Sequence, residues 1–381
     1  MKIFSLFLSI IIFSFSTVFA KHQSAAYDFF SFDKYEVKGS NNFLKLSSDL
    51  IKDKVVVREI KNKNKTGLFS YLLYSNNHIK IDEFDIPQIF KDNKGLLPGN
   101  SVGKSMVSYI TGYAICEGYI DNVDQIINDW SALKGTLYEN QKLIDLLNMK
   151  AGDQMIIGFK RHKQSHKLED TFNVNVIPIK NILESKILQT TKKERPTYNY
   201  NALATNIIMN YTMFKVGDSY QNLLNKVFRE DAKIKNSVYF SKTLRPGSYD
   251  DGGQYGRYSF YANRYDYLRI AIAIMEHWNN NTCIGKYLKE IYERRVSKNR
   301  TKYNGDRYGQ FNISLYSKSY GGQFHFDIAN LSLNKRKILG MDGKGGQNIL
   351  IDFERKRIIV INARDLHYNW KKIVIEKLKQ K

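Results

Sequence analysis

The sequence predicts an α+β fold in which a large helical insertion interrupts a domain built on an antiparallel sheet. Three observations support this class. Strand-like segments occur before residue 100, helical segments fill the middle of the chain, and strand-like segments return after residue 320 before a final helix. With 381 residues, of which 43% are hydrophobic, the chain can bury a substantial core.

The first twenty residues differ from the rest and have the pattern of an export signal. Lys2 precedes an apolar run, and Val18 and Ala20 stand at positions −3 and −1 of a cleavage site. The run is short for a membrane span, so cleavage after Ala20 is preferred to an uncleaved anchor. Lys21, in place of a cysteine, argues against a lipoprotein. We therefore expect residues 1–20 to be a signal peptide and the protein to be periplasmic or secreted.

The next part of the chain, residues 21–100, is expected to hold a polar lead-in and the first strands. Segments 54–60 and 67–84 are rich in β-branched and aromatic residues. A turn signal at 75–77 divides the second segment into two strands. The Pro-Gly-Asn break at 98–100 then ends the β-rich region.

Residues 101–310 are expected to be mainly helical. Apolar residues recur at helical spacing from Ser101 to Glu117, and Gly118 ends the pattern. Further helices are expected at 119–130, 141–152, 201–214, 220–228, 261–278 and 284–296.

Residues 311–381 are expected to complete the sheet-containing domain. Strands are predicted at 321–333 and 348–363, the second as a hairpin that turns at 353–356. A helix at 368–381 closes the chain. Together with the first strands, these elements predict terminal helices that flank one sheet.

The charge is strongly positive, at +22, but the composition offers the preferred explanation. The chain is rich in Lys, Asn, Ile and Tyr together, as AT-rich coding produces. Export makes nucleic acid an unexpected partner and leaves an anionic envelope surface as the natural one. A nucleic-acid binder remains a third hypothesis. The oligomeric state is left open.

Neither the cysteines nor the histidines predict a metal site. Cys116 falls in an apolar helical pattern, so buried free thiols at Cys116 and Cys283 are preferred to a disulfide, although export permits one. Two cysteines cannot supply a zinc cluster of the usual spacing. His162 and His166 are four residues apart in a strongly basic segment that would repel a cation. No metal or organic cofactor is expected.

The stretch Gly-Asn-Ser-Val-Gly-Lys-Ser at 99–105 admits two interpretations. A phosphate-binding loop needs four residues between its first glycine and Gly-Lys-Ser, but only three separate Gly99 from Gly103. The alternative is a nucleophile and base in Ser101-x-x-Lys104. The same spacing occurs at Ser31–Lys34, Ser131–Lys134 and Ser332–Lys335, so spacing alone is weak.

Position distinguishes Ser101 from the other three serines. Ser101 opens an apolar helix, where Lys104 lies on the same face and can reach its hydroxyl. Free N–H groups at a helix start favour a developing oxyanion. Apolar neighbours would desolvate Lys104 and lower its pKa, which suits a base. A helix cap and a solvated lysine are the simpler alternative.

The surroundings of this motif resemble the serine β-lactamase-like family, from about residue 50 to the C-terminus. That family includes class C β-lactamases, DD-peptidases, esterases and 6-aminohexanoate-dimer hydrolases. The resemblance implies a β-lactamase/transpeptidase-like fold and places the chain nearest the esterase and oligomer-hydrolase branch. Beyond Ser101 and Lys104, it rests on Ala114, Glu117-Gly118, Ile120-Asp121, Leu146-Leu147, Met149 and Ala151-Gly152.

The resemblance also implies a catalytic tyrosine at the head of a later helix. Tyr200 is preferred because Thr205 and an apolar helix follow it as in the family, and Tyr198 is the reserve. The tyrosine would share a proton with Lys104 and protonate the leaving group. Ala202 stands where β-lactamases often carry a substrate-binding amide.

A third element of the family is a strand that lines the site, matched here by Leu-Gly-Met-Asp-Gly-Lys-Gly-Gly-Gln. Met341, Asp342 and Gly343 would line the substrate, and the amide of Lys344 would join that of Ser101 as an oxyanion donor. Met341 replaces the lysine that binds a β-lactam carboxylate, which argues against a true β-lactamase.

These observations predict an exported serine hydrolase that cleaves an amide or ester bond of a small or peptide-like substrate through an acyl-enzyme on Ser101. The alternative hypothesis is a non-catalytic cell-envelope binding protein on a penicillin-binding-like scaffold.

Overall fold

The computed structural model describes residues 33–157, 168, 177–242, 256–298, 317–328 and 336–380. The expected signal peptide, the two histidines at 162 and 166, and the Ser332–Lys335 pair lie outside these residues. Within them, no helix combines the length and the apolar character needed to cross a membrane.

A nine-stranded sheet forms the centre of the fold and draws on both ends of the chain. Neighbouring strands are antiparallel, except for the parallel pair at one edge. In spatial order the strands are β10 (Val296–Ser297), β11 (Ser317–Gly321), β12 (Phe324–Ile328), β13 (Ile338–Gly343), β14 (Gln347–Asp352), β15 (Arg357–Ala363), β3 (Leu68–Ser75), β4 (His78–Phe84) and β2 (Ser47–Ser48).

The pairing of β15 with β3 joins the C-terminal strands to the N-terminal ones. Val360 lies opposite Leu72 and Ile358 opposite Tyr74. Every residue of both strands is buried, because side chains pack on both faces of the sheet at this point. This double burial explains why the two segments read as nearly continuous apolar runs.

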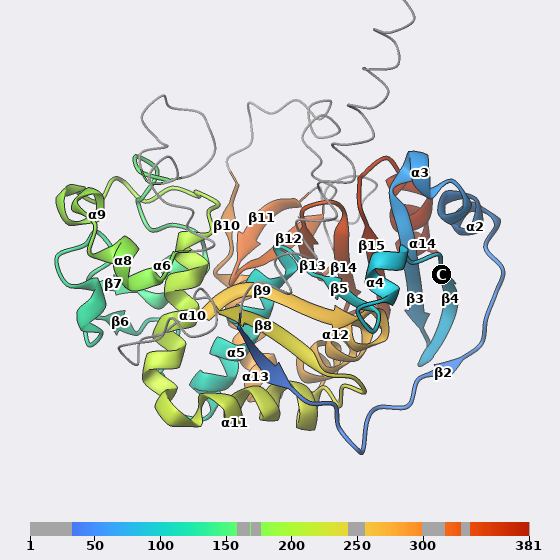
Figure 1. The fold of residues 1–381 in the computed structure, drawn as a ribbon, viewed down its shortest axis with the longest axis horizontal. Coiled ribbons are helices and arrows are strands. Elements are labelled where there is room, and N and C mark those ends of the chain that lie inside the picture. The colour runs from blue at the N-terminus through green and yellow to red at the C-terminus, as the bar shows by residue number, and fades with distance from the viewer. Residues whose placement is uncertain are drawn as a thin grey trace, which may run out of the picture.

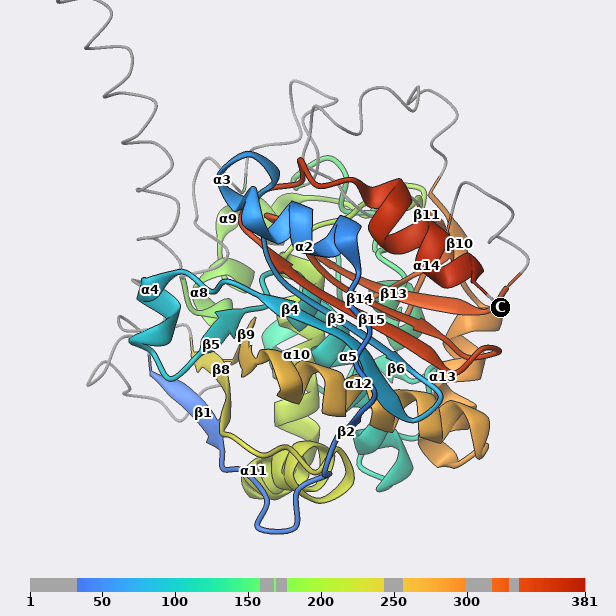
Figure 2. The same cartoon turned by 90° about the vertical axis from the view of Figure 1, so that its right-hand side faces the viewer.

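One face of the sheet is covered by helices from the two ends of the chain. These are α2 (Lys54–Lys61), the π-helical turn η6 (Lys371–Ile375) and α14 (Glu376–Lys379). Figure 2 shows them in front of the strands, and they share a core with Leu73, Ile359 and Ile361. This arrangement confirms the predicted terminal helices around one antiparallel sheet.

The helical part packs against the other face, where the main core lies. In Figure 1 it fills the left and lower parts of the view. Its helices are α5 (Val102–Cys116), α6 (Leu143–Leu147), α8 (Ile179–Leu183), α9 (Lys186–Thr190), α10 (Leu203–Val216), α11 (Tyr220–Leu224), the π-helical η3 (Asn225–Asp231), α12 (Arg264–Asn279) and α13 (Cys283–Glu293). Short elements are α3 (Lys63–Thr66), α4 (Gln88–Lys91), η1 (Ser131–Leu133) and η2 (Gly217–Ser219).

A second sheet leads directly to the start of α5. It is four-stranded, and its strands in order are β1 (Lys34–Val37), β8 (Val238–Lys242), β9 (Gly256–Asn263) and β5 (Leu96–Pro98). Because β5 ends at Pro98, three residues before Ser101, and pairs with β9, this sheet fixes where α5 begins.

Two sequence predictions of secondary structure are wrong. Segment 54–60 was expected to be a strand and is helix α2. Asp53 caps this helix by accepting hydrogen bonds from the amides of Val55 and Val56, both at 3.0 Å. Val56 and Ile60 are buried one helical turn apart, so capping and packing override the β propensity of the valines.

Segment 119–130 was expected to be a helix but forms turns and strand β6 (Ile126–Ile127), which pairs with β7 (Gln141–Lys142). Its backbone bonds to a neighbouring segment rather than to itself. The amides of Leu143 and Ile144 donate to the carbonyls of Gln125 and Val123 at 2.9 and 2.8 Å. Similarly, the predicted helix at 261–278 begins only at Arg264, because β9 occupies the preceding residues.

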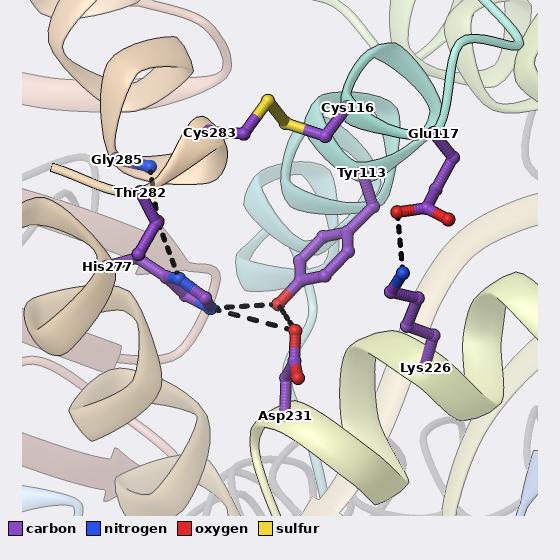
Figure 3. The surroundings of a disulfide bond; sticks show 9 residues. All are labelled: Tyr113, Cys116, Glu117, Lys226, Asp231, His277, Thr282, Cys283 and Gly285. Carbon is purple, nitrogen blue, oxygen red and sulfur yellow. Dashed lines mark hydrogen bonds and ion pairs between the residues drawn. A yellow bond between two sulfur atoms is a disulfide. The ribbon is translucent and has the colours of Figure 1, made fainter.

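The prediction of free cysteines is also wrong, since Cys116 and Cys283 form a disulfide. It joins the last residue of α5 to the first residue of α13 (Figure 3). The two helices pack closely because Gly112 leaves room for Tyr287: a Cβ at Gly112 would lie 2.5 Å from that ring. One turn before Cys116, the Tyr113 hydroxyl donates to Asp231 at 2.7 Å.

Replacing both cysteines by serine is expected to lower the free energy of unfolding by about 2–5 kcal/mol, because the bridge closes a loop whose ends are 167 residues apart. Denaturant titration of the wild type and of C116S/C283S measures this difference. As a control, a reducing agent should destabilise the wild type to the same extent and leave the double variant unchanged. Equal stability of the two proteins would contradict the expectation.

Candidate active site

The start of α5 packs closely against strand β9. The amide of Gly99 donates to the Phe260 carbonyl at 2.8 Å, and Asn100 turns the chain with a φ of 50°. A Cβ at Gly103 would lie 1.7 Å from the Tyr258 carbonyl oxygen, so a glycine is required there. These contacts set the position of Ser101, which remains partly exposed at the head of the helix.

Lys104 lies beneath Ser101 with only 2% of its surface exposed. Its Nζ donates to the Asn201 carbonyl at 3.1 Å. The same atom lies 3.7 Å from the centroid of the Tyr258 ring and 5.1 Å from that of Tyr200. Burial lowers the pKa of the Lys104 ammonium well below its ordinary value, so the neutral amine is favoured.

Tyr200 is the tyrosine that reaches the serine. Burial raises the pKa of its phenol well above the ordinary value, and the nearby Ser101 side chain offsets part of this rise. The structure thus brings Ser101, Lys104 and Tyr200 together. The reserve candidate, Tyr198, instead packs its ring against Tyr320, with 5.4 Å between the ring centroids.

The end of strand β13 lies beside the start of α5. A Cβ at Gly343 would lie 2.2 Å from the Gly99 carbonyl oxygen, and the side-chain amide of Asn100 donates to the Lys344 carbonyl at 2.6 Å. Asp342 is partly exposed, and its charge contributes to raising the pKa of Tyr200. Met341 is fully buried in the main core, so its role as a residue lining the substrate stays a prediction.

A buried carboxylate holds the segment that carries Tyr200. Asp153 accepts hydrogen bonds from the side-chain amides of Asn199 at 2.7 Å and Asn201 at 3.0 Å, and from the Tyr138 hydroxyl at 2.8 Å. Burial raises the pKa of Asp153 above its usual range. Asn201 also accepts from the Ala204 amide at 2.9 Å through its side chain, at the start of α10.

Sequence reasoning did not identify Asp153, Tyr258 or Tyr320 as neighbours of the site. Tyr258 lies on β9 and Tyr320 on β11, each more than a hundred residues from Ser101 in the chain. A weak signal exists for Tyr320 alone, because it directly precedes the Gly321-Gly322 pair. Among the described residues, no group of three or more His, Cys, Asp or Glu side chains is placed to hold a metal ion.

The fold is that of the serine β-lactamases and penicillin-binding proteins. Three solved structures illustrate the range of this class. A protein described as a 6-aminohexanoate-dimer hydrolase from Bacillus anthracis superposes with a TM-score of 0.62 at 14% identity, over 91% of this chain and 90% of that one. A class C β-lactamase from Rhodobacter sphaeroides superposes with a TM-score of 0.56 at 12% identity, over 86% of this chain and 100% of that one.

A D-stereospecific amidohydrolase from Streptomyces gives a TM-score of 0.55 at 11% identity, over 85% of this chain and 98% of the other. No protein-family model matches the sequence, and no curated protein matches it. At these identities the likeness establishes the fold, which confirms the fold expected from the sequence resemblance.

The Lys104→Met variant is expected to gain stability relative to the wild type as the pH falls from 10 to 7. Below the ordinary lysine pKa of 10.5, unfolding of the wild type takes up a proton that the folded Lys104 does not hold. The wild-type free energy of unfolding therefore rises with pH, by at most about 1.4 kcal/mol per unit from this group, and methionine removes that slope. Denaturant titrations at several pH values measure it.

Surface-exposed Lys65→Met serves as the matched control, because its side chain is solvated in both states. Parallel stability profiles for the wild type and Lys104→Met would show that Lys104 is charged in the folded protein.

Proposed function

We propose that the protein is an exported serine hydrolase that cleaves an amide or ester bond through an acyl-enzyme on Ser101. The observation that carries the proposal is the closeness of three groups: the Ser101 side chain acts on the Tyr200 phenol, and the Tyr200 ring centroid lies 5.1 Å from Nζ of the buried Lys104. Lysine is expensive to bury, and a neutral amine beside a hydroxyl is suited to accept its proton. A catalytic base requires such a lysine beside the serine, whereas a non-catalytic binding protein does not.

In the proposed first step, the Ser101 oxygen attacks the substrate carbonyl. Its proton passes to the Lys104 amine, directly or through the Tyr200 phenol, as the carbon–oxygen bond forms. Tyr200, whose raised pKa keeps it protonated at neutral pH, then donates a proton to the departing nitrogen or oxygen and regains one from Lys104. Water attacks the acyl-enzyme in the second step and releases the acid.

The oxyanion is proposed to bind between two backbone amides, those of Ser101 and Lys344. The first belongs to the start of α5, where the helix dipole favours negative charge. The second follows Gly343 at the end of β13, and the contact of Asn100 with Lys344 keeps the two segments together. Preorganised donors of this kind contribute about 3–4 kcal/mol each to rate acceleration.

The proposed site lies between the two parts of the molecule assigned from the sequence. Residues 101–310 would supply Ser101, Lys104 and Tyr200, and residues 311–381, with the strands of 21–100, would supply the wall around Asp342 and Gly343. Amide substrates other than β-lactams fit best, because Met341 replaces the lysine expected for a β-lactam carboxylate. The names of the hydrolase and amidohydrolase neighbours agree with an amide substrate.

Export is part of the proposal. The sequence pattern of residues 1–20 is one argument, and the disulfide between Cys116 and Cys283 is an independent one, since such bonds persist in oxidising compartments. An anionic envelope surface would then be in contact with a chain whose charge is +22.

Ser101→Ala is expected to lower kcat/KM for p-nitrophenyl esters by at least about a thousandfold, since the nucleophile is removed while the fold is kept. Release of p-nitrophenol measures the rate. Ser131→Ala is the matched control, because Ser131 has the same spacing to a lysine but is exposed on η1, and its activity should equal that of the wild type. Full activity of Ser101→Ala would contradict the proposal.

A further inference from the structure

A cavity of about 520 Å³ is lined in part by Tyr198, two residues before Tyr200 in the chain. The cavity is open to solvent, and three segments line it: the residue after Met149, the segment that leads into Tyr200, and the edge strand β10. Its volume is within the range of small-molecule sites. The lining residues are Lys150, Arg195, Pro196, Thr197, Tyr198, Val296 and Ser297.

Backbone hydrogen bonds hold two sides of this cavity at a fixed separation. The amide of Asn199 donates to the Met149 carbonyl at 2.7 Å, and that of Glu194 donates to the Gly152 carbonyl at 2.9 Å. Gly152 is needed for this approach, because a Cβ there would lie 2.5 Å from the Glu194 carbonyl oxygen. Lys150 and Arg195 therefore stand on two segments that are bonded side by side.

The charge of the cavity is positive. Lys150 and Arg195 both line it, and no Asp or Glu is among the described residues of its lining. The remaining wall is formed by Pro196, Tyr198 and Val296, with hydroxyl groups from a threonine and a serine. Two cations above an apolar and aromatic wall are suited to a carboxylate at the end of a hydrocarbon chain.

Two tyrosines that are two residues apart in the chain connect the cavity with Ser101. Tyr198 lines the cavity, and Tyr200 reaches Ser101, while both rings pack against Tyr320 with centroid distances of 5.4 and 5.9 Å. Two residues of extended chain span at most about 7 Å. Asp342 would repel an anion next to the serine, so a negative group is favoured only at the remote, cationic end.

We propose that this cavity is a subsite for an anionic group that the substrate carries several bonds away from the bond that is cleaved. The substrate class is then an amide or ester with a carboxylate at the end of one arm. This inference rests on the proposed function. It also explains why Met341 can stand where the family has a carboxylate-binding lysine: in this protein Lys150 and Arg195 would bind the substrate carboxylate.

The test compares two pairs of esters, each with a carboxylate and its neutral methyl ester. In the first pair the carboxylate is at the end of the acyl arm: the mono-p-nitrophenyl ester of adipic acid is compared with its methyl ester. In the second pair a carboxyl group is on the nitrophenyl leaving group of a hexanoate ester. Water cleaves each into an acid and a nitrophenol, whose absorbance gives the rate. In one of the two pairs, kcat/KM of the wild type should be about tenfold higher for the carboxylate than for its methyl ester, because KM is lower.

Lys150→Met and Arg195→Met should each reduce this preference about threefold or more and leave kcat/KM for the neutral esters unchanged. Lys65→Met makes the same change of charge on α3 and should keep the preference. The inference is overturned if the neutral esters are cleaved and neither carboxylate is preferred, or if the preference survives in both variants. If the wild type cleaves none of the esters, the proposed function fails, and the inference fails with it.

Discussion

The burial of Lys104 is the constraint on which the site depends. An amine that is 2% exposed loses its hydration. This loss is compensated in part by the Asn201 carbonyl and by the rings of Tyr200 and Tyr258. The Asn201 carbonyl is in place because Asp153 fixes the surrounding segment, and Tyr258 is in place because Gly103 lets α5 touch β9. The segments that bury the lysine therefore also set the serine and the tyrosine.

The sheet supplies the rest of the geometry. Strand β13 reaches the start of α5 only because residue 343 has no side chain, and the chain then turns so that Lys344 meets Asn100. Further along the same sheet, Tyr320 on β11 supports both Tyr198 and Tyr200. The Tyr320 ring thus contacts both Tyr200, beside Ser101, and Tyr198, which lines the cationic cavity. A change at this position of the sheet would therefore affect both the proposed active site and the proposed subsite.

Local signals in the sequence predicted the start of α5, the hairpins and the C-terminal helix, because turn residues and apolar periodicity act over a few positions. The Ser101–Lys104 pair could be singled out for the same reason. Contacts between distant segments could not be predicted: nothing near Cys116 indicates Cys283, and nothing near Lys104 indicates Tyr258. At 54–60, three valines favour a strand, and only the cap from Asp53 and burial of Val56 and Ile60 reveal a helix.

The most direct test of the central claim is to locate a covalent adduct. The folded protein is treated with a fluorophosphonate, digested with trypsin and examined by mass spectrometry. One adduct is expected, on Ser101 in the peptide of residues 95–104, with slower labelling of Tyr200→Phe than of Tyr198→Phe. An adduct on another serine, or no adduct on the folded wild type, would contradict the central claim.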